Sequence, residues 1–141
     1  MGGTISCVID DVVAHWHAFL ENGDPAALDA LLADDVVFYS PVVFTPQHGK
    51  DVTTMYLMGA KQVLAGDGGE GQFRYAKEVL AGDTAVLEFE TSLGGKYVNG
   101  VDIIRCNGAG KIVEFRVMLR PLQAINAVHE AMAAMLESMK S

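Results

Sequence analysis

The sequence predicts an α+β fold, in which helices come first along the chain and an antiparallel sheet follows. In the first half, apolar residues recur every three or four positions, which is typical of amphipathic helices. After residue 72 they alternate with polar residues, which is typical of strands. Turns of only two to four residues separate the segments of the second half, so neighbouring strands run antiparallel. We therefore expect helices to cover one face of a curled antiparallel sheet.

Length and composition indicate one domain with its own core. The chain has 141 residues, half of them hydrophobic and a fifth charged, so a single domain over 1–141 buries a sizeable core. The net charge is −8, and residues 1–70 hold ten acidic side chains against two basic ones. Without a basic patch, neither nucleic acid nor an anionic membrane surface is an expected partner.

Two helices are expected before residue 33. The first, over 5–20, carries an apolar stripe with steps of three and four residues. Gly23 ends it, since glycine readily adopts the left-handed conformation that closes a helix. Asp24 then provides a side-chain cap and Pro25 stands at the first helical position, which predicts a short second helix through Leu32.

The next stretch predicts one short strand and a third helix. A pair of aspartates breaks the second helix, and the apolar residues after them predict a strand over 36–39. Apolar residues at helical spacing predict a helix over 52–63. The segments 46–49 and 66–71 have the glycine and proline content of loops.

The second half predicts four strands and a closing helix. The strands cover 73–80, 84–93, 97–106 and 111–119. The helix over 122–139 has apolar residues along one side, among them several methionines. These methionines offer an adaptable apolar surface that either caps a pocket or packs on a partner chain.

The strand at 97–106 contains the residue on which the functional interpretation depends. Alternation places Asp102 and Arg105 on opposite faces, and parity alone does not say which face is buried. If Arg105 joins Glu88 and Glu90 on the charged face, charges pair across strands and Asp102 points into the apolar interior. Desolvation would raise the pKa of a carboxyl group there, as in a proton donor or general acid. The alternative is a structural aspartate bonded to nearby backbone or helix-cap donors.

Several short motifs follow one another along the chain: Gly23-Asp24, Ala33-Asp34-Asp35, Ser40-Pro41, Pro46 through Gly49, Gly100 through Arg105 and Gly110 through Ile112. With the order of elements, they resemble the NTF2-like superfamily, and within it the SnoaL-like and ketosteroid-isomerase-like proteins, over residues 5–121. The resemblance implies a cystatin-like cone, in which a curved antiparallel sheet wraps around the N-terminal helices, with 122–141 as a helical extension. This scaffold hosts isomerases, dehydratases, cyclases, hydrolases and binding proteins, so function has to be argued from the site.

The resemblance also suggests roles for individual residues. Asp102 matches the protonated aspartate of the isomerases' oxyanion hole. Ser40 matches the position of their general-base aspartate, and a serine cannot take a proton from carbon without a base of its own. Trp16 stands where those enzymes place a tyrosine that donates to the oxyanion. Because two of the three groups differ, steroid isomerisation by the known mechanism is not expected.

Histidines and cysteines give weaker signals. His15 and His17 lie two positions apart on a helix, so they do not face the same side as metal ligands would. His17, beside Trp16, is a candidate base, with a surface histidine as the alternative. No group of Cys, His and acidic residues has zinc spacing, so no metal and no cofactor are expected. Cys7 and Cys106 need no disulfide in a chain of this size, which favours a reducing cytoplasm.

Three tyrosines, Tyr39, Tyr56 and Tyr75, are able to place a hydroxyl group in a pocket. For each of them, core packing with one satisfied hydrogen bond is the simpler interpretation. The sequence leaves these alternatives open.

The predicted function is binding of a small apolar organic molecule in the cone, with Asp102 as its main polar contact. One alternative is an acid/base enzyme of isomerase, dehydratase or polyketide-cyclase type, with Asp102, His17 and Ser40 as catalytic set. Another is a dimerising interaction domain with a filled cavity. A homodimer is expected through the outer sheet face and the C-terminal helix. The predicted pocket walls are Trp16, Phe19, Phe38, Tyr56, Leu87, Phe89, Ile104, Phe115, Val117 and Leu119.

Overall fold

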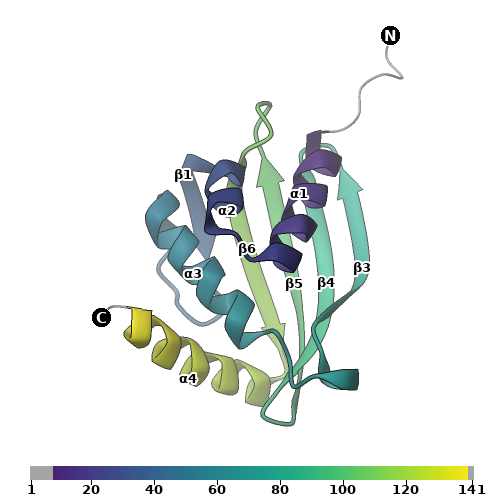
Figure 1. Cartoon of the computed structure of the whole chain (residues 1–141), viewed down its shortest axis with the longest axis vertical. Helices are drawn as coiled ribbons and strands as arrows, with labels where there is room; N and C mark the ends of the chain where they lie inside the picture. The colour runs from purple at the N-terminus through teal and green to yellow at the C-terminus, as the bar shows by residue number, and fades with distance from the viewer. Residues whose placement is uncertain (1–7, 140–141) are drawn as a thin grey trace.

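The computed structural model describes residues 8–139, in which four α-helices pack against one six-stranded sheet. Helices α1, α2 and α3 cover one face of the curved sheet, and α4 lies across its end beside α3 (Figure 1). The α+β fold class predicted from the sequence is confirmed. The helices are α1 (Val8–Asn22), α2 (Pro25–Leu31), α3 (Lys50–Val63) and α4 (Leu122–Met139), with a short 3₁₀ helix, η2, at Gly69–Gly71.

The sheet has the strand order β2-β1-β6-β5-β4-β3. Strands β3 to β6 form the predicted antiparallel meander, and β1 joins it by pairing parallel to β6. A parallel pair requires a crossover connection, which here includes α3 and the rest of the meander. The strands are β1 (Leu32–Tyr39), β2 (Gln47–His48), β3 (Arg74–Ala81), β4 (Thr84–Leu93), β5 (Lys96–Cys106) and β6 (Ile112–Arg120).

The signals that start and stop the first helices act as expected. Gly23 has a φ of 66° and its N–H donates to the Phe19 carbonyl, which closes α1. The Asp24 side chain accepts a hydrogen bond from the Ala26 N–H at the start of α2. The predicted beginning of the first helix at Ile5 and the cysteine Cys7 lie outside the described residues.

Parts of the first half differ from the prediction. Strand β1 begins at Leu32, so Leu32 belongs to the sheet rather than to the second helix. Asp34 and Asp35 are exposed and coincide with a shift in the β1–β6 register, so the aspartate pair interrupts the pairing within a strand. The predicted loop at 46–49 contains the short strand β2, whose His48 pairs with Val37.

A bulge changes which residues of β6 point inward. The register between β5 and β6 shifts between Arg105 and Cys106, and the Ile112 and Phe115 side chains are both buried. Strict alternation back from the buried Phe115 would bury Val113 as well, whereas Val113 is half-buried. An extra residue in one strand reverses the side-chain parity beyond it.

None of the helices between residues 8 and 139 is both long enough and apolar enough to span a membrane.

Candidate ligand cavity

The inner face of the sheet and the helices enclose a cavity of about 870 Å³. Its volume lies in the range of pockets that hold small organic molecules. The alternative of an interaction domain requires a filled interior, and this cavity therefore disfavours it. The apolar part of its wall comes from the sheet, from α3 and from α4, through Phe38, Phe89, Phe115, Val117, Leu119, Leu57, Ala60, Leu64, Val128, Met132 and Leu136.

Asp102 lies on the inner face of β5 and lines this cavity. Its side chain is 6% exposed, and it shares the buried face with Gly100 and Ile104. Arg105 points the other way, is exposed, and forms an ion pair with Glu114 at 3.3 Å. The strand is therefore oriented as the charge argument predicted, with the acid inward and the arginine outward.

A chain of two hydrogen bonds ends at Asp102. The indole Nε1–H of Trp16 donates to the Tyr75 hydroxyl oxygen at 2.8 Å. The Tyr75 hydroxyl in turn donates to Oδ2 of Asp102 at 2.5 Å. These three residues come from α1, β3 and β5, so the fold brings together side chains that are far apart in the sequence.

Burial dominates the electrostatics of this cluster. Desolvation raises the pKa of Asp102 to about 7, although the hydrogen bond from Tyr75 acts in the opposite direction by stabilising the carboxylate. Burial, with the neighbouring Asp102, raises the pKa of the Tyr75 hydroxyl far above its ordinary value. At neutral pH, Tyr75 therefore keeps its proton, and Asp102 is the group whose charge changes.

His17 lies at the same cavity, next to Tyr75. The two rings meet edge to face with centroids 5.4 Å apart. The His17 Nε2 is 3.0 Å from a carboxylate oxygen of Glu78, and both side chains are partly exposed. His17 thus approaches Asp102 through Tyr75, and its imidazole is paired with a carboxylate on β3.

Ser40 lines the cavity, and backbone groups already use its hydroxyl oxygen. The oxygen accepts hydrogen bonds from the N–H groups of Val42 and Val43, at 3.1 and 3.3 Å. Such a turn fixes the segment that follows β1. Because its oxygen already accepts two hydrogen bonds, the Ser40 hydroxyl can donate its hydrogen but is not available to accept a proton.

The predicted wall residues divide into two groups. Three of them, Phe19, Leu87 and Ile104, are fully buried in the core and do not line the cavity. The reason is that α1 packs directly on β4 and β5 and covers this part of the sheet. The other seven line the cavity: Trp16, Phe38, Tyr56, Phe89, Phe115, Val117 and Leu119.

The methionines of α4 left two alternatives open in the sequence, a cap on the pocket or a contact with a partner chain, and the structure places α4 at the cavity. Met132 of α4 lines the cavity. Helices α3 and α4 approach closely at Gly59, where an added Cβ would lie 3.4 Å from Met132 Cε and from Met135 Cγ. The C-terminal helix therefore supplies one wall of the cavity rather than standing apart from it. The α4 residues that line the cavity are Val128, His129, Met132, Ala133 and Leu136.

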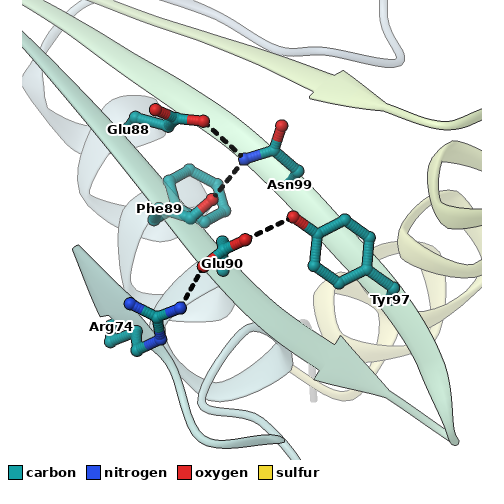
Figure 2. Close-up of polar contacts among 6 residues, drawn as sticks. All are labelled: Arg74, Glu88, Phe89, Glu90, Tyr97 and Asn99. Carbon is teal, nitrogen blue, oxygen red and sulfur yellow. Dashed lines mark hydrogen bonds and ion pairs between the residues drawn. The ribbon is translucent and has the colours of Figure 1, made fainter. Parts of the chain in front are cut away.

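Arg74 connects the rim of the cavity with the outer face of the sheet. It lines the cavity at the start of β3, and its guanidinium forms an ion pair with Glu90 on β4. Glu90 also accepts a hydrogen bond from Tyr97 at 2.5 Å, and the neighbouring Asn99 donates to Glu88 at 3.1 Å (Figure 2). Glu88 and Glu90 therefore have hydrogen-bond or ion-pair partners on the outer face. Asp102, on the neighbouring strand β5, points to the inner face instead.

No group of three or more histidine, cysteine, aspartate or glutamate residues between 8 and 139 is arranged to hold a metal ion.

Solved structures of other proteins are similar to this chain over most of its length. A steroid delta-isomerase from Pseudomonas aeruginosa is 32% identical, with 96% of each chain covered and a TM-score of 0.86. An uncharacterized protein with a cystatin-like fold from Silicibacter pomeroyi is also 32% identical, covering 87% of this chain and 83% of its own, with a TM-score of 0.77. An NTF2-like protein of unknown function from Mesorhizobium loti, 21% identical over 81% of this chain and 92% of its own, shares the fold with a TM-score of 0.67.

Family assignment follows from the sequence match together with these folds. No curated protein sequence matches the chain. The model of the SnoaL-like domain, however, matches residues 13–115, which is most of the chain and extends from α1 to β6. The match includes the Trp16, Tyr75 and Asp102 positions that form the hydrogen-bonded chain. The protein belongs to the SnoaL-like family, within the NTF2-like fold.

Proposed function

We propose that the protein binds a small, largely apolar organic molecule that carries a hydrogen-bond acceptor, such as a carbonyl oxygen. The observation that carries this proposal is the buried Asp102 carboxyl in a cavity with apolar walls. A carboxyl whose pKa is about 7 is neutral in a large fraction of molecules at neutral pH, and a neutral carboxyl donates a hydrogen bond. Asp102 is then the main polar contact, and the aromatic and aliphatic walls contribute the apolar contacts.

Native mass spectrometry of the purified protein tests this proposal without knowledge of the ligand. The spectrum of the wild type is compared with those of Asp102→Ala and Asp10→Ala, the latter an exposed aspartate on α1. We expect a co-purified small molecule on the wild type and on Asp10→Ala, with loss from Asp102→Ala. Equal retention by both variants would remove Asp102 from the binding site.

An acid/base enzyme of the isomerase type is the second candidate. The observation in its favour is Tyr75, which lies within hydrogen-bond distance of Asp102 and in contact with His17. The similarity to a protein described as a steroid delta-isomerase points in the same direction. Against it stands Ser40, whose oxygen is occupied by two backbone donors and which takes the place of a base. Of the predicted catalytic set of Asp102, His17 and Ser40, this candidate relies on Asp102 and His17, because Ser40 offers no base.

Exchange of carbon-bound protons distinguishes the two candidates. 1-Tetralone, a bicyclic ketone, is incubated with the protein in D₂O, and deuterium uptake next to its carbonyl group is followed by NMR. An enzyme that polarises the carbonyl and removes a proton accelerates uptake, and Asp102→Asn reduces that acceleration. A binding protein leaves the uptake at the rate of the buffer, even where 1-tetralone binds.

We further propose that two copies pair through the outer sheet face and the C-terminal helix. The supporting observation is a row of apolar side chains on that face, Val79, Val86 and Ile103, which occupy adjacent register positions on three strands. Val79 is 55% exposed, and Leu122 at the start of α4 is 70% exposed. Contiguous exposed apolar surface of this kind is typical of protein interfaces. The cytoplasmic location expected from the cysteines stays a prediction.

A further inference from the structure

In the Trp16–Tyr75–Asp102 chain, the hydrogen bond between Trp16 and Tyr75 can run in only one direction, from the indole to the hydroxyl. An indole N–H is a donor and never an acceptor. Trp16 therefore obliges the Tyr75 oxygen to accept, at 2.8 Å. The single hydroxyl hydrogen of Tyr75 is then directed to its other neighbour, Oδ2 of Asp102, at 2.5 Å. A phenylalanine or a histidine at position 16 would not impose this direction.

This direction determines which atoms of the cluster are left for a ligand. The hydrogen of Tyr75 is used by Asp102, and Oδ2 of Asp102 is used as its acceptor. As long as Tyr75 donates to Oδ2, a proton taken up by Asp102 goes to the other oxygen, Oδ1. Tyr75 is then a fixed partner of Asp102 and not a donor to bound molecules.

We propose that Trp16 is a positioning residue, which acts through the Tyr75 hydroxyl so that Oδ1 of Asp102 is the proton-carrying atom of the site. The consequence for ligand binding rests on the proposed function, in which the Oδ1–H group donates the hydrogen bond to the acceptor of the ligand. The arrangement itself is a property of the protein without a ligand. Trp16 thereby has a role beyond its packing against Phe19 and Phe115.

Other charged groups near the cluster have to be separated from Asp102 in any titration. His17 of α1 stands against the Tyr75 ring and is paired with Glu78 of β3. The other ionisable groups that line the same cavity are Glu21 of α1, Lys61 of α3, Arg74 of β3 and His129 of α4. The inner residues of β4 and β6 nearest to Asp102 in the sheet register are Leu87 and Val117, which do not ionise.

Trp16 is the only tryptophan of the chain, so the wild-type protein contains a direct reporter. Its indole N–H gives one NMR signal, which we follow with pH together with the carboxyl carbon signal of Asp102. If the two are coupled through Tyr75, both signals change with the same midpoint. His17→Gln should leave that shared midpoint in place, because His17 is outside the chain of hydrogen bonds. An indole signal whose midpoint moves in His17→Gln, or that does not change with pH, would overturn the proposal.

Variants then test whether Trp16 acts through Tyr75. Loss of the indole donor in Trp16→Phe weakens donation by Tyr75, so the midpoint of the Asp102 titration should shift upward. Tyr75→Phe removes the donor to the carboxylate altogether and should shift it further. In the Tyr75→Phe background, Trp16→Phe should produce no additional shift. Phe19→Leu, a change of packing beside Trp16, should produce none in either background.

Two results would contradict this role for Trp16. One is an unchanged Asp102 midpoint in a folded Trp16→Phe variant. The other is a shift of the same size with and without the Tyr75 hydroxyl, which would indicate altered burial rather than hydrogen bonding. Because no ligand is present in these titrations, their outcome is independent of the binding measurements.

Discussion

Tyr75 and Asp102 share a 2.5 Å hydrogen bond although their strands, β3 and β5, are separated by β4. The Tyr75 side chain therefore reaches over the inner face of β4, where Phe89 packs against it with ring centroids 6.3 Å apart. The bond connects the edge of the sheet with its centre. The carboxyl group is in this way held at the cavity by a partner that the local sequence around Asp102 does not contain.

The first prediction concerns the pH dependence of stability. Asp102 has a pKa of about 7 when folded, against an ordinary value of about 3.9 when unfolded. The folded state holds the proton more tightly, so this contribution to stability is fully present below pH ~4 and is lost as the pH rises through 7. The loss is on the order of 4 kcal/mol in unfolding free energy.

Urea unfolding of wild type and Asp102→Asn at pH 5, 6, 7 and 8 measures this term. Asparagine has the same shape and does not ionise in this range. The stability of the wild type relative to the variant should therefore fall between pH 5 and 7 and level off above pH 7, where Asp102 is ionised in both the folded and the unfolded state. Parallel pH profiles would show that the Asp102 carboxyl is not perturbed by burial.

A second prediction concerns Gly100, which shares the inner face of β5 with Asp102. A Cβ added there would lie 2.5 Å from Phe89 Cζ, 2.7 Å from Leu119 Cδ2 and 2.8 Å from the Met118 carbonyl oxygen. Gly100→Ala should therefore cost about 1–3 kcal/mol in unfolding free energy, because the backbone oxygen cannot move aside easily. Gly108→Ala is the matched control, since nothing lies within 4 Å of its added Cβ. Equal thermal stability of the two variants would contradict this packing.

Ser40 gives a third prediction, in which stability and chemistry are separated. Ser40→Ala removes the acceptor for the Val42 and Val43 N–H groups and should lower the unfolding free energy by about 1 kcal/mol. Ser40→Thr keeps the oxygen and should retain most of that stability. If the protein accelerates deuterium uptake by 1-tetralone, a folded Ser40→Ala variant should retain the acceleration. Its complete loss at unchanged ketone affinity would make Ser40 catalytic.

The proposed homodimer gives a fourth prediction. Val86 pairs with Val79 on one side and with Ile103 on the other, so a lysine there puts a charge in the middle of the apolar row. Val86→Lys should convert the dimer to monomer in sedimentation velocity, because a buried unpaired charge is strongly unfavourable. Ala18→Lys, on an exposed position of α1, should leave the dimer intact. A wild type that sediments as a monomer would contradict the pairing itself.

Local patterns were sufficient for most of the fold. The helix at 122–139 and the strand at 84–93 have the predicted bounds, because period and turn residues agree there. The inward orientation of Asp102 was also predictable, since Arg105 had a better place among the acids of the outer face. Each of these inferences uses neighbours in sequence or on the adjacent strand.

The partner of Asp102 was not predictable, and the reason is a bulge in β3. The register with β4 shifts between Tyr75 and Lys77. Tyr75 and Glu78 therefore both point to the inner face, where they contact Asp102 and His17, although they are three positions apart. Strict alternation cannot describe that pattern. The contact also spans two strands, and no spacing in the sequence encodes a contact of that kind. For α4, the apolar stripe predicted either a cap on the pocket or a contact with a partner chain, and only the packing of the fold shows that it lines the cavity.

The most direct test of the central claim is the pH dependence of 1-tetralone affinity, followed by the fluorescence of Trp16. A neutral Asp102 donates a hydrogen bond to the ketone oxygen, whereas the carboxylate repels it. We therefore predict a constant affinity below pH 6 and a decrease through a midpoint near 7, the pKa of Asp102. Asp102→Asn should bind without this transition. Wild-type affinity that is unchanged across this range, or that rises with pH, would contradict the account.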